Sequence, residues 1–174
     1  MSERTRRFEA AVLPHLDAAY NLARWLLRDD QSAQDVVQEA CLRAFRFFDS
    51  LRGDEARPWL LGIVRNACFT WLSDHKHGPL EFDEERDSTD LDPAWQQSAD
   101  GPERLLERKL ERAQVNAAIA TLPPLFREVL ILRELEACSY EEIAHIIGAP
   151  SGTVMSRLSR ARTLLRAALT GKEN

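Results

Sequence analysis

Apolar residues recur at intervals of three and four along most of the chain, which is the spacing of one face of an α-helix. No segment shows the strict alternation of apolar and polar residues that marks a half-buried strand. The first half contains three such apolar stripes, and we expect a helix over each. The stripes are Phe8, Val12, Leu16, Ala19, Tyr20, Ala23, Leu26 and Leu27; Val36, Val37, Ala40, Cys41, Ala44, Phe45 and Phe48; and Trp59, Leu60, Ile63, Val64, Ala67, Cys68, Trp71 and Leu72.

Prolines and polar residues mark the places where these helices break. Pro14 interrupts the first stripe, and we expect a kink or a restart there because proline lacks the backbone donor that a helix needs. Asp30 is placed to cap the second helix with its carboxylate. The loop SLRGDEARP, residues 50–58, then separates the second helix from the third.

The helical pattern stops in the middle of the chain. Between His75 and Pro102 the sequence holds three prolines, two glycines and many acidic residues, and residues 76–107 carry a net charge of -7 against -5 for the whole chain. Low apolar content and like charge leave little to bury, so we expect a flexible acidic linker over residues 77–101. Its one large apolar residue, Trp95, either docks on a domain or is exposed.

Helical periodicity resumes at Pro102, a residue type that suits the first turn of a helix. One apolar stripe precedes the break at Leu122-Pro123-Pro124 and another follows it. These stripes are Leu105, Leu106, Leu110, Ala113, Val115 and Ile119, and Phe126, Val129, Leu130, Leu132 and Leu135. The sequence therefore predicts an all-α fold with two small helical domains, 1–76 and 102–174, joined by the acidic linker.

The segment SYEEIAHIIGAPSGTVMSRLSRARTLLR, residues 139–166, has the features of a helix–turn–helix. Ser139 and Glu142 form the capping-box pattern, in which each side chain bonds to a free amide at the start of a helix. Gly148 is suited to end that helix because glycine readily adopts the left-handed conformation. Ser151 is placed to cap the helix that follows.

The second helix of this motif is basic although the chain is acidic. With Val154 and Leu158 facing inward, its outer face is polar, and residues 151–172 contain five basic residues and no acidic one. Arginine can bond bidentately to guanine, and serine or threonine can contact bases or phosphates. A solvated basic surface helix is the alternative, but the capping box and glycine turn favour DNA binding. The predicted DNA-contacting residues are Thr153, Ser156, Arg157, Ser159 and Arg160.

Residues 122–166 resemble region four of bacterial sigma factors, above all the extracytoplasmic-function type, which has only regions two and four. DDQSAQDVVQEACLRAFRFFDSLR, residues 29–52, resembles region 2.2, and ARPWLLGIVRNACFTWLSDHK, residues 56–76, resembles regions 2.3 and 2.4. Two separate motifs occur in the order that the family has. The resemblance implies a sigma factor that binds core RNA polymerase, recognises a bipartite promoter and helps to open its downstream element.

The resemblance also implies roles for single residues. Asp35, Gln38 and Glu39 stand where such factors dock on the coiled coil of the largest polymerase subunit, and their spacing puts them on one helix face. From spacing alone, an ordinary solvated face is the preferred interpretation, and the presence of the second motif reverses that preference. Asn66 stands where the family contacts the minus-ten element, where the loop over residues 50–57 is also expected to contribute.

The helix–turn–helix has one departure from the family pattern that concerns base preference. Ser156, Arg157, Ser159 and Arg160 match the contacts to the minus-thirty-five element, but Met155 stands where many relatives carry a basic residue. This difference concerns which bases are preferred. It does not change the mode of binding that the resemblance implies.

Other sequence features bear on the class of protein. The sequence shows no paired-carboxylate pocket, no nucleophile–base pair and no phosphate-binding glycine loop, so we expect neither an enzyme nor a cofactor. His75 and His77 are a weak metal pair, more typical of a solvated helix end, and no metal site is predicted. The three cysteines are far apart, which favours free thiols in the cytoplasm. No apolar run is long enough for membrane insertion.

Two other functions are compatible with the helical pattern. One is a helix–turn–helix regulator that binds duplex DNA as a dimer without being a polymerase subunit. The other is an interaction protein whose basic helix is incidental. The sigma-factor interpretation differs from both because it predicts core polymerase and promoter DNA as partners, together with an anti-sigma factor that the family implies.

Overall fold

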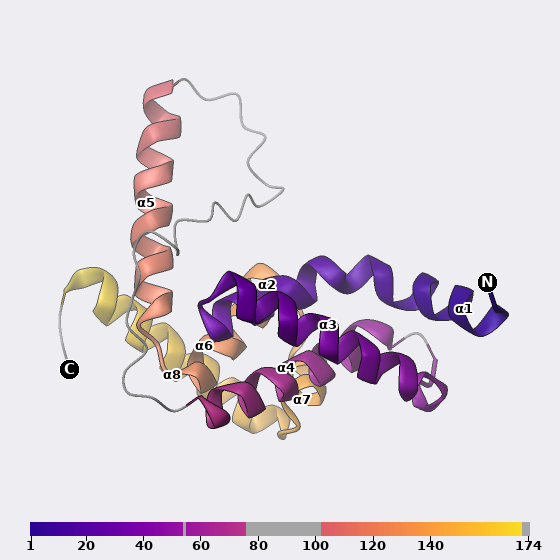
Figure 1. The fold of residues 1–174 in the computed structure, drawn as a ribbon. Helices are drawn as coiled ribbons and strands as arrows, with labels where there is room; N and C mark the ends of the chain where they lie inside the picture. The colour runs from indigo at the N-terminus through magenta and orange to yellow at the C-terminus, as the bar shows by residue number, and fades with distance from the viewer. Residues whose placement is uncertain (54, 76–101, 172–174) are drawn as a thin grey trace.

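A computed structural model of the protein describes residues 1–53, 55–75 and 102–171, and every regular element within these ranges is helical. Figure 1 shows their arrangement. The first half contains α1 (Glu3–Val12), a short 3-10 turn (Leu13–His15), α2 (Leu16–Leu27), α3 (Asp30–Arg46), a second 3-10 turn (Phe48–Ser50) and α4 (Ala56–Asp74). The second half contains α5 (Pro102–Ala120), α6 (Pro124–Leu130), a π-helical turn (Ile131–Leu135), α7 (Tyr140–Ile147) and α8 (Ser151–Thr170).

The helix boundaries follow the sequence signals closely, with one shift. The restart expected at Pro14 is confirmed, because the 3-10 turn that contains it separates α1 from α2. The prediction that Asp30 caps α3 is wrong by one residue. Asp29 is the N-cap, and its carboxylate accepts a hydrogen bond from the Ser32 amide at 3.0 Å. Asp30 instead begins the helix and accepts a bond from the hydroxyl of Tyr20.

Helices α2, α3 and α4 enclose the core of the first half. Leu22, Leu26, Leu60 and Val64 are fully buried there, as the apolar stripes predict. Phe45 belongs to the predicted stripe of α3 but is 36% exposed, although its ring meets that of Phe8 on α1 edge-on, with 5.1 Å between the ring centres. The stripe therefore predicts the helix correctly and overestimates how much of it is buried.

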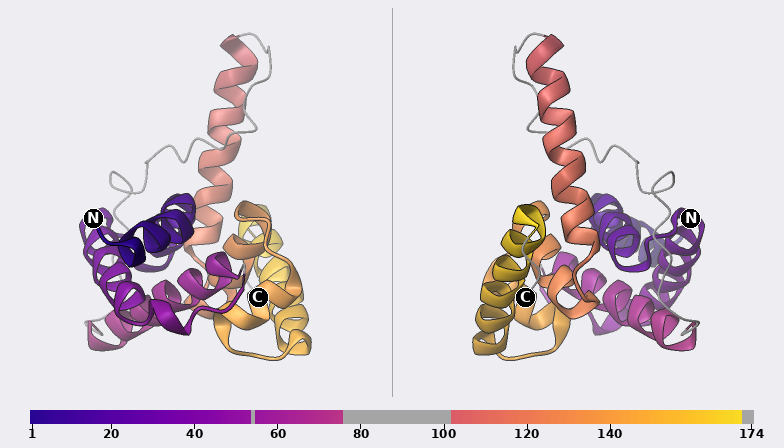
Figure 2. Two further views of the ribbon diagram at one scale, coloured as in Figure 1. Left: turned by 90° about the vertical axis from the view of Figure 1, so that its right-hand side faces the viewer. Right: turned by 90° about the vertical axis from the view of Figure 1, so that its left-hand side faces the viewer.

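The second half is built around α6, α7 and α8. Leu132, Ile143 and Leu158 are among its largest fully buried side chains, and each comes from a different segment. Helix α5 projects away from this core, as Figures 1 and 2 show. The leucines of its first turns, Leu105 and Leu106 among them, are exposed, and burial begins only near Ala118. The stripe predicted for this helix therefore lies outside the core along most of its length.

The two halves pack directly on one another, which the sequence does not predict. Their buried residues form one continuous apolar cluster, and α4 of the first half lies against α7 of the second. The two helices come close at Gly62, where a side-chain carbon would lie 3.6 Å from the backbone oxygen of Ile146, an ordinary contact that leaves room for little more than a methyl group. The linker predicted at residues 77–101, with Trp95, lies outside the described residues, as does His77. The domain boundaries remain a prediction.

Candidate nucleic-acid and protein interfaces

Helices α7 and α8 form the helix–turn–helix that the sequence predicts. The Ser139 hydroxyl accepts a hydrogen bond from the Glu142 amide, and the Glu142 carboxylate accepts one from the Ser139 amide, both at 3.1 Å. Gly148 ends α7 with a φ of +66°. Ser151 does not cap α8, because it is already the first helical residue, and Pro150 occupies the N-cap position without a side-chain acceptor.

The outer face of α8 carries the residues predicted to contact DNA. Val154, Leu158 and Ala161 are buried against the rest of the motif, which turns the opposite face outward. Among the described residues, the predicted set lies along the N-terminal half of this helix, where a recognition helix meets the major groove. Ser156, Ser159 and Arg160 are exposed, whereas Thr153 and Arg157 are half-buried.

Contacts within the domain position two arginines of α8 without burying them. The Arg160 guanidinium lies over the ring of Phe126, 5.4 Å from its centre, in a cation–π contact. Arg162 donates to the Glu134 carboxylate at 3.0 Å. Met155, at the position where the family pattern has a basic residue, is exposed on the same helix. The face therefore presents cationic, hydroxyl and apolar groups together.

Asn66, the residue predicted to contact the minus-ten element, is exposed on α4. Its amide oxygen lies 3.4 Å from Nη1 of Arg65, which holds the side chain beside a positive charge. Trp59 and Trp71 are partly buried against the core, as predicted. The Trp71 ring stacks on His75, which directly follows the end of α4.

The three residues predicted to dock on polymerase share one exposed face of α3. Asp35, Gln38 and Glu39 lie opposite the buried Val36 and Ala40. Gln31 donates to Asp35 at 3.0 Å, one turn before, so the polar face is partly organised by its own contacts.

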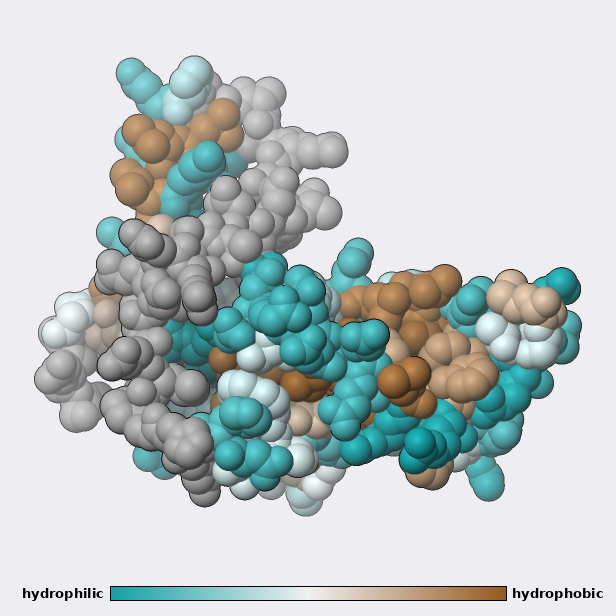
Figure 3. Space-filling view, viewed as in Figure 1, coloured by the Kyte–Doolittle hydropathy of each residue, from teal (hydrophilic) through white to brown (hydrophobic). Residues whose placement is uncertain are grey.

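An apolar patch continues this polar face, and the sequence analysis did not identify it. Leu42, 69% exposed, follows Gln38 by one turn, and Phe45 and Phe47 are exposed beyond it. Figure 3 shows apolar side chains gathered over the region of α1, α2 and α3. Exposed apolar patches beside polar groups are typical of protein-binding surfaces. The sequence does contain a signal for this patch. Leu42 is apolar but lies off the predicted apolar stripe of its helix, so helical spacing turns it outward.

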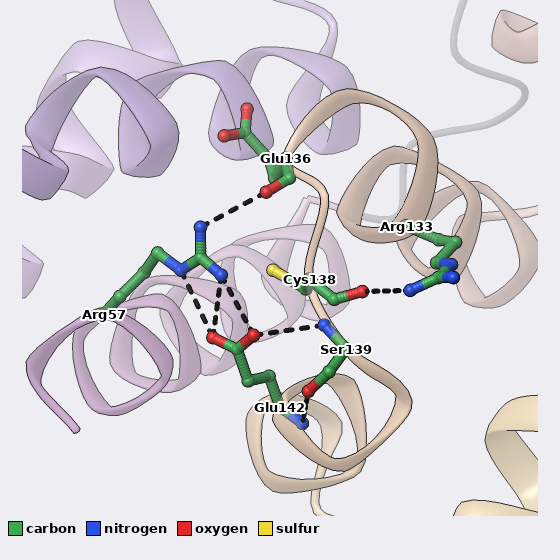
Figure 4. Close-up of polar contacts among 6 residues, drawn as sticks. All are labelled: Arg57, Arg133, Glu136, Cys138, Ser139 and Glu142. Atoms are coloured by element: carbon green, nitrogen blue, oxygen red, sulfur yellow. Dashed lines mark hydrogen bonds and ion pairs between the residues drawn. The ribbon is translucent and has the colours of Figure 1, made fainter.

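Two arginines of α4 bind carboxylates of the second half. Arg57 donates from Nη2 to both oxygens of Glu142, at 2.8 and 3.0 Å, and from Nη1 to the carbonyl oxygen of Glu136, at 3.3 Å (Figure 4). Arg65 donates to the two oxygens of Glu128, at 2.8 and 3.0 Å. Bidentate pairs of this kind are among the strongest hydrogen-bonded contacts in proteins.

These two carboxylates have different environments. Partial burial raises the pKa of Glu142, but hydrogen bonds from Arg57 and from the Ser139 amide outweigh it, so the pKa lies below its ordinary value. Glu128 is fully buried, and this burial raises its pKa in spite of Arg65 and the nearby charge of Arg157.

A third arginine joins the halves through backbone carbonyls. Arg127 is almost completely buried, and its Nη1 donates to the Trp25 carbonyl at 2.6 Å, near the end of α2. Its Nη2 donates to the Leu122 carbonyl at 2.8 Å. Carbonyls at a helix end lack partners within the helix, so the guanidinium satisfies groups that would otherwise be buried alone. The sequence offers no local signal for this contact.

The predicted sites lie on three different helices. Asn66 lies on α4, which packs against α7, the first helix of the helix–turn–helix, whereas the predicted DNA contacts of that motif lie on its second helix, α8. The polar face of α3 is separate from both. Within the described ranges, no group of three His, Cys, Asp or Glu side chains is arranged to hold a metal ion, and no helix has both the length and the apolar character of a membrane span.

Two family models match the chain in this order. Residues 11–78 match Sigma-70 region 2, and residues 112–165 match Sigma-70, region 4. The RNA polymerase sigma-H factor of Pseudomonas aeruginosa is 36% identical over 168 residues, covering 94% of this chain and 86% of that protein. The chain belongs to the extracytoplasmic-function sigma factors of the sigma-70 family. This assignment confirms the family and the all-α fold that the sequence predicts.

Further comparisons agree with this family. The extracytoplasmic-function RNA polymerase sigma-E factor of Escherichia coli K12 is 39% identical to this sigma factor over 132 residues, covering 74% of this chain and 69% of that one. Among solved structures, the sigma factor RpoE of Bartonella quintana, in complex with the anti-sigma factor NepR, superposes with a TM-score of 0.70 at 27% identity. That match covers 97% of this chain and 99% of the other.

Proposed function

We propose that this sigma factor binds core RNA polymerase through α3, reads the minus-ten element with α4 and reads the minus-thirty-five element with α8. The helix–turn–helix carries the proposal, because its outer face is polar, basic and exposed at the end that meets a major groove. The protein acts by binding and positioning, without covalent chemistry of its own, and it works with polymerase in the bacterial cytoplasm.

The proposed polymerase contact combines charge with apolar area. Asp35 and Glu39 supply negative charge, and the exposed Leu42 supplies apolar surface one turn further along α3. Interfaces of this composition have an apolar centre and a polar rim, and the charges mainly set orientation and association rate. The match of residues 11–78 to Sigma-70 region 2 makes a regulator that acts without polymerase a poorer explanation of the first half.

The proposed DNA contacts divide between the halves. On α8, Arg157 and Arg160 supply the cationic groups, and Ser156 and Ser159 supply hydroxyls for bases or phosphates. On α4, Asn66 supplies an amide for the edge of an unstacked base. An anti-sigma factor is also a proposed partner, on the analogy of the Bartonella quintana factor, whose structure contains one.

The double substitution Asp35→Arg with Glu39→Arg tests the polymerase contact. We expect loss of co-elution with core RNA polymerase and loss of promoter-directed transcription, because two attractive charges become repulsive. Both residues are exposed, so the helical content measured by circular dichroism should not change. The matched control is Glu103→Arg with Glu107→Arg on α5, an exposed pair at the same spacing. Normal co-elution of the α3 variant would rule out this face as the docking site.

A further inference from the structure

One side of α4 carries two arginines, two turns apart, next to the proposed minus-ten contact. Arg57, Leu61 and Arg65 follow at intervals of four, which places them along one face. Arg65 lies directly beside Asn66, with 3.4 Å between Nη1 and the amide oxygen. A strand that reaches Asn66 along this helix therefore passes over positive charge.

In the free chain, carboxylates of the second half occupy both arginines. Glu142 binds Arg57 bidentately and Glu128 binds Arg65 in the same way, with distances of 2.8 to 3.0 Å. Carboxylates and phosphates present two oxygens to a guanidinium in the same geometry. Arg57 and Arg65 are eight residues apart in α4, or about 12 Å along the helix axis, so two phosphates of a nucleic-acid backbone that are not immediate neighbours can also satisfy this arrangement.

This packed arrangement is incompatible with simultaneous reading of two promoter elements. Helices in contact, such as α4 and α7, have axes about 8–10 Å apart. Elements centred near minus ten and minus thirty-five are about 25 base pairs apart, or ~85 Å along duplex DNA. The halves must therefore separate before both elements are read, and separation removes Glu142 and Glu128 from the two arginines.

We propose that Arg57 and Arg65 of α4 bind phosphates of promoter DNA, and that Glu142 and Glu128 occupy them in place of phosphates while the two halves are packed together. The proposal rests on the function proposed above for α4. It adds two residues to the nucleic-acid surface and makes the second half a competitor for that surface. A DNA strand and the second half of the protein therefore cannot occupy this face of α4 at the same time.

Glu142→Gln tests the competition with little disturbance of the fold. Glutamine is accepted at this position of a capping box, so the start of α7 is preserved while the charged partner of Arg57 is lost. Binding of a fluorescent single-stranded DNA of mixed sequence, about 20 nucleotides long, is measured by anisotropy with the full chain. We expect Glu142→Gln to bind about three- to tenfold more tightly than the unsubstituted chain, because Arg57 becomes available to phosphate.

The matched control is Glu141→Gln, which makes the same charge change at an exposed position one residue earlier. It measures the non-specific gain from removing one negative charge, and we expect it to be well below the gain of Glu142→Gln. Arg57→Gln breaks the same ion pair from the other side. It should bind no more tightly than the unsubstituted chain, and the double substitution Arg57→Gln with Glu142→Gln should not recover the gain.

The proposal is tested by comparing the effects of Arg57→Gln and Glu142→Gln on DNA affinity. Equal gains for Arg57→Gln and Glu142→Gln would mean that separation alone exposes the DNA surface and that Arg57 is not a phosphate contact. Equal affinities for Glu142→Gln and Glu141→Gln would mean that the carboxylate does not compete. Co-elution with core polymerase is measured in parallel on the unsubstituted chain. If the unsubstituted chain does not co-elute with core polymerase, the proposed function is wrong, but the DNA affinities of the variants can still be compared.

Discussion

Arg127 and Glu128 are adjacent charged residues that the structure buries almost completely. Their sequence context, LFREVL, resembles the polar side of an exposed helix. Arg127 is stabilised by backbone carbonyls of both halves, and Glu128 by Arg65. Burying a charge is costly unless it is paired and hydrogen-bonded, and these contacts compensate for the cost of removing the two charges from water. They also make each residue dependent on partners more than sixty positions away.

Glu128→Gln should change how stability depends on pH. Burial raises the pKa of Glu128 above its ordinary value of 4.5, with Arg65 and Arg157 opposing the shift. Between 4.5 and the raised pKa the folded chain binds more protons than the unfolded chain, so this group's contribution to stability falls as pH rises. Glutamine does not titrate. The melting temperature of the variant minus that of the unsubstituted chain should therefore increase with pH across this window.

Thermal melts followed by circular dichroism from about pH 4 to pH 8 measure this difference. Glu111→Gln, an exposed carboxylate on α5, is the control and should show no such trend. A melting-temperature difference that stays constant with pH, or narrows as pH rises, would contradict the raised pKa of Glu128.

At the scale of elements, α7 and α8 begin in different ways although both are preceded by plausible caps. The capping box of α7 satisfies two amides, whereas the predicted cap of α8, Ser151, lies inside the helix and bonds none. Pro150 sets this register, because its fixed φ suits the residue just before a helix and leaves Ser151 as the first helical residue. When a proline precedes a serine at the start of a helix, the sequence therefore does not tell which of the two is the N-cap.

Ser139→Ala and Ser151→Ala form a matched pair that tests this difference. Ser139→Ala should lower the free energy of unfolding by about 1 kcal/mol, because it removes a hydrogen bond to an otherwise free amide. Ser151→Ala should change it by less than about 0.5 kcal/mol, since both side chains are exposed but only the first caps a helix. Urea denaturation followed by circular dichroism gives both values. Equal losses would show that Ser151 caps α8 after all.

For the whole molecule, the packing of α4 against α7 determines which surfaces are available. Their crossing point is Gly62, opposite the Ile146 backbone. The ion pairs of Arg57 and Arg65 lie near this crossing, and the continuous apolar cluster extends through it. Substitution at Gly62 therefore acts on the arrangement of the halves without altering any proposed contact residue.

Gly62→Leu should separate the two halves, whereas Gly62→Ala should not. A Cβ at this position would lie 3.6 Å from the Ile146 oxygen, which is an ordinary contact, so alanine fits. Alanine should even stabilise α4 by about 0.5–1 kcal/mol, because glycine is unfavourable inside a helix. The longer leucine side chain has no room between the backbones. Small-angle scattering should give a larger radius of gyration for the leucine variant alone, and an unchanged radius would show that the crossing adapts.

The sequence by itself determined the features that depend on neighbouring residues. Helical periodicity, the restart at Pro14, the capping box of Ser139 and the left-handed Gly148 all follow from interactions within a few positions along the chain. The family motifs add the order of the two domains and the helices on which Asp35, Asn66 and Arg160 lie. Helical spacing also predicts which positions face outward, and these three side chains are indeed exposed.

Only the tertiary structure decided which apolar stripes are buried and which charges meet. The leucines in the first turns of α5 have helical spacing but are exposed, so periodicity could not distinguish them from core residues. The pairs of Arg57 with Glu142 and Arg65 with Glu128 join residues 85 and 63 positions apart. Such pairs depend on how two helical units dock, and docking is set by shape and burial over many residues together, for which no local pattern in the sequence is a signal.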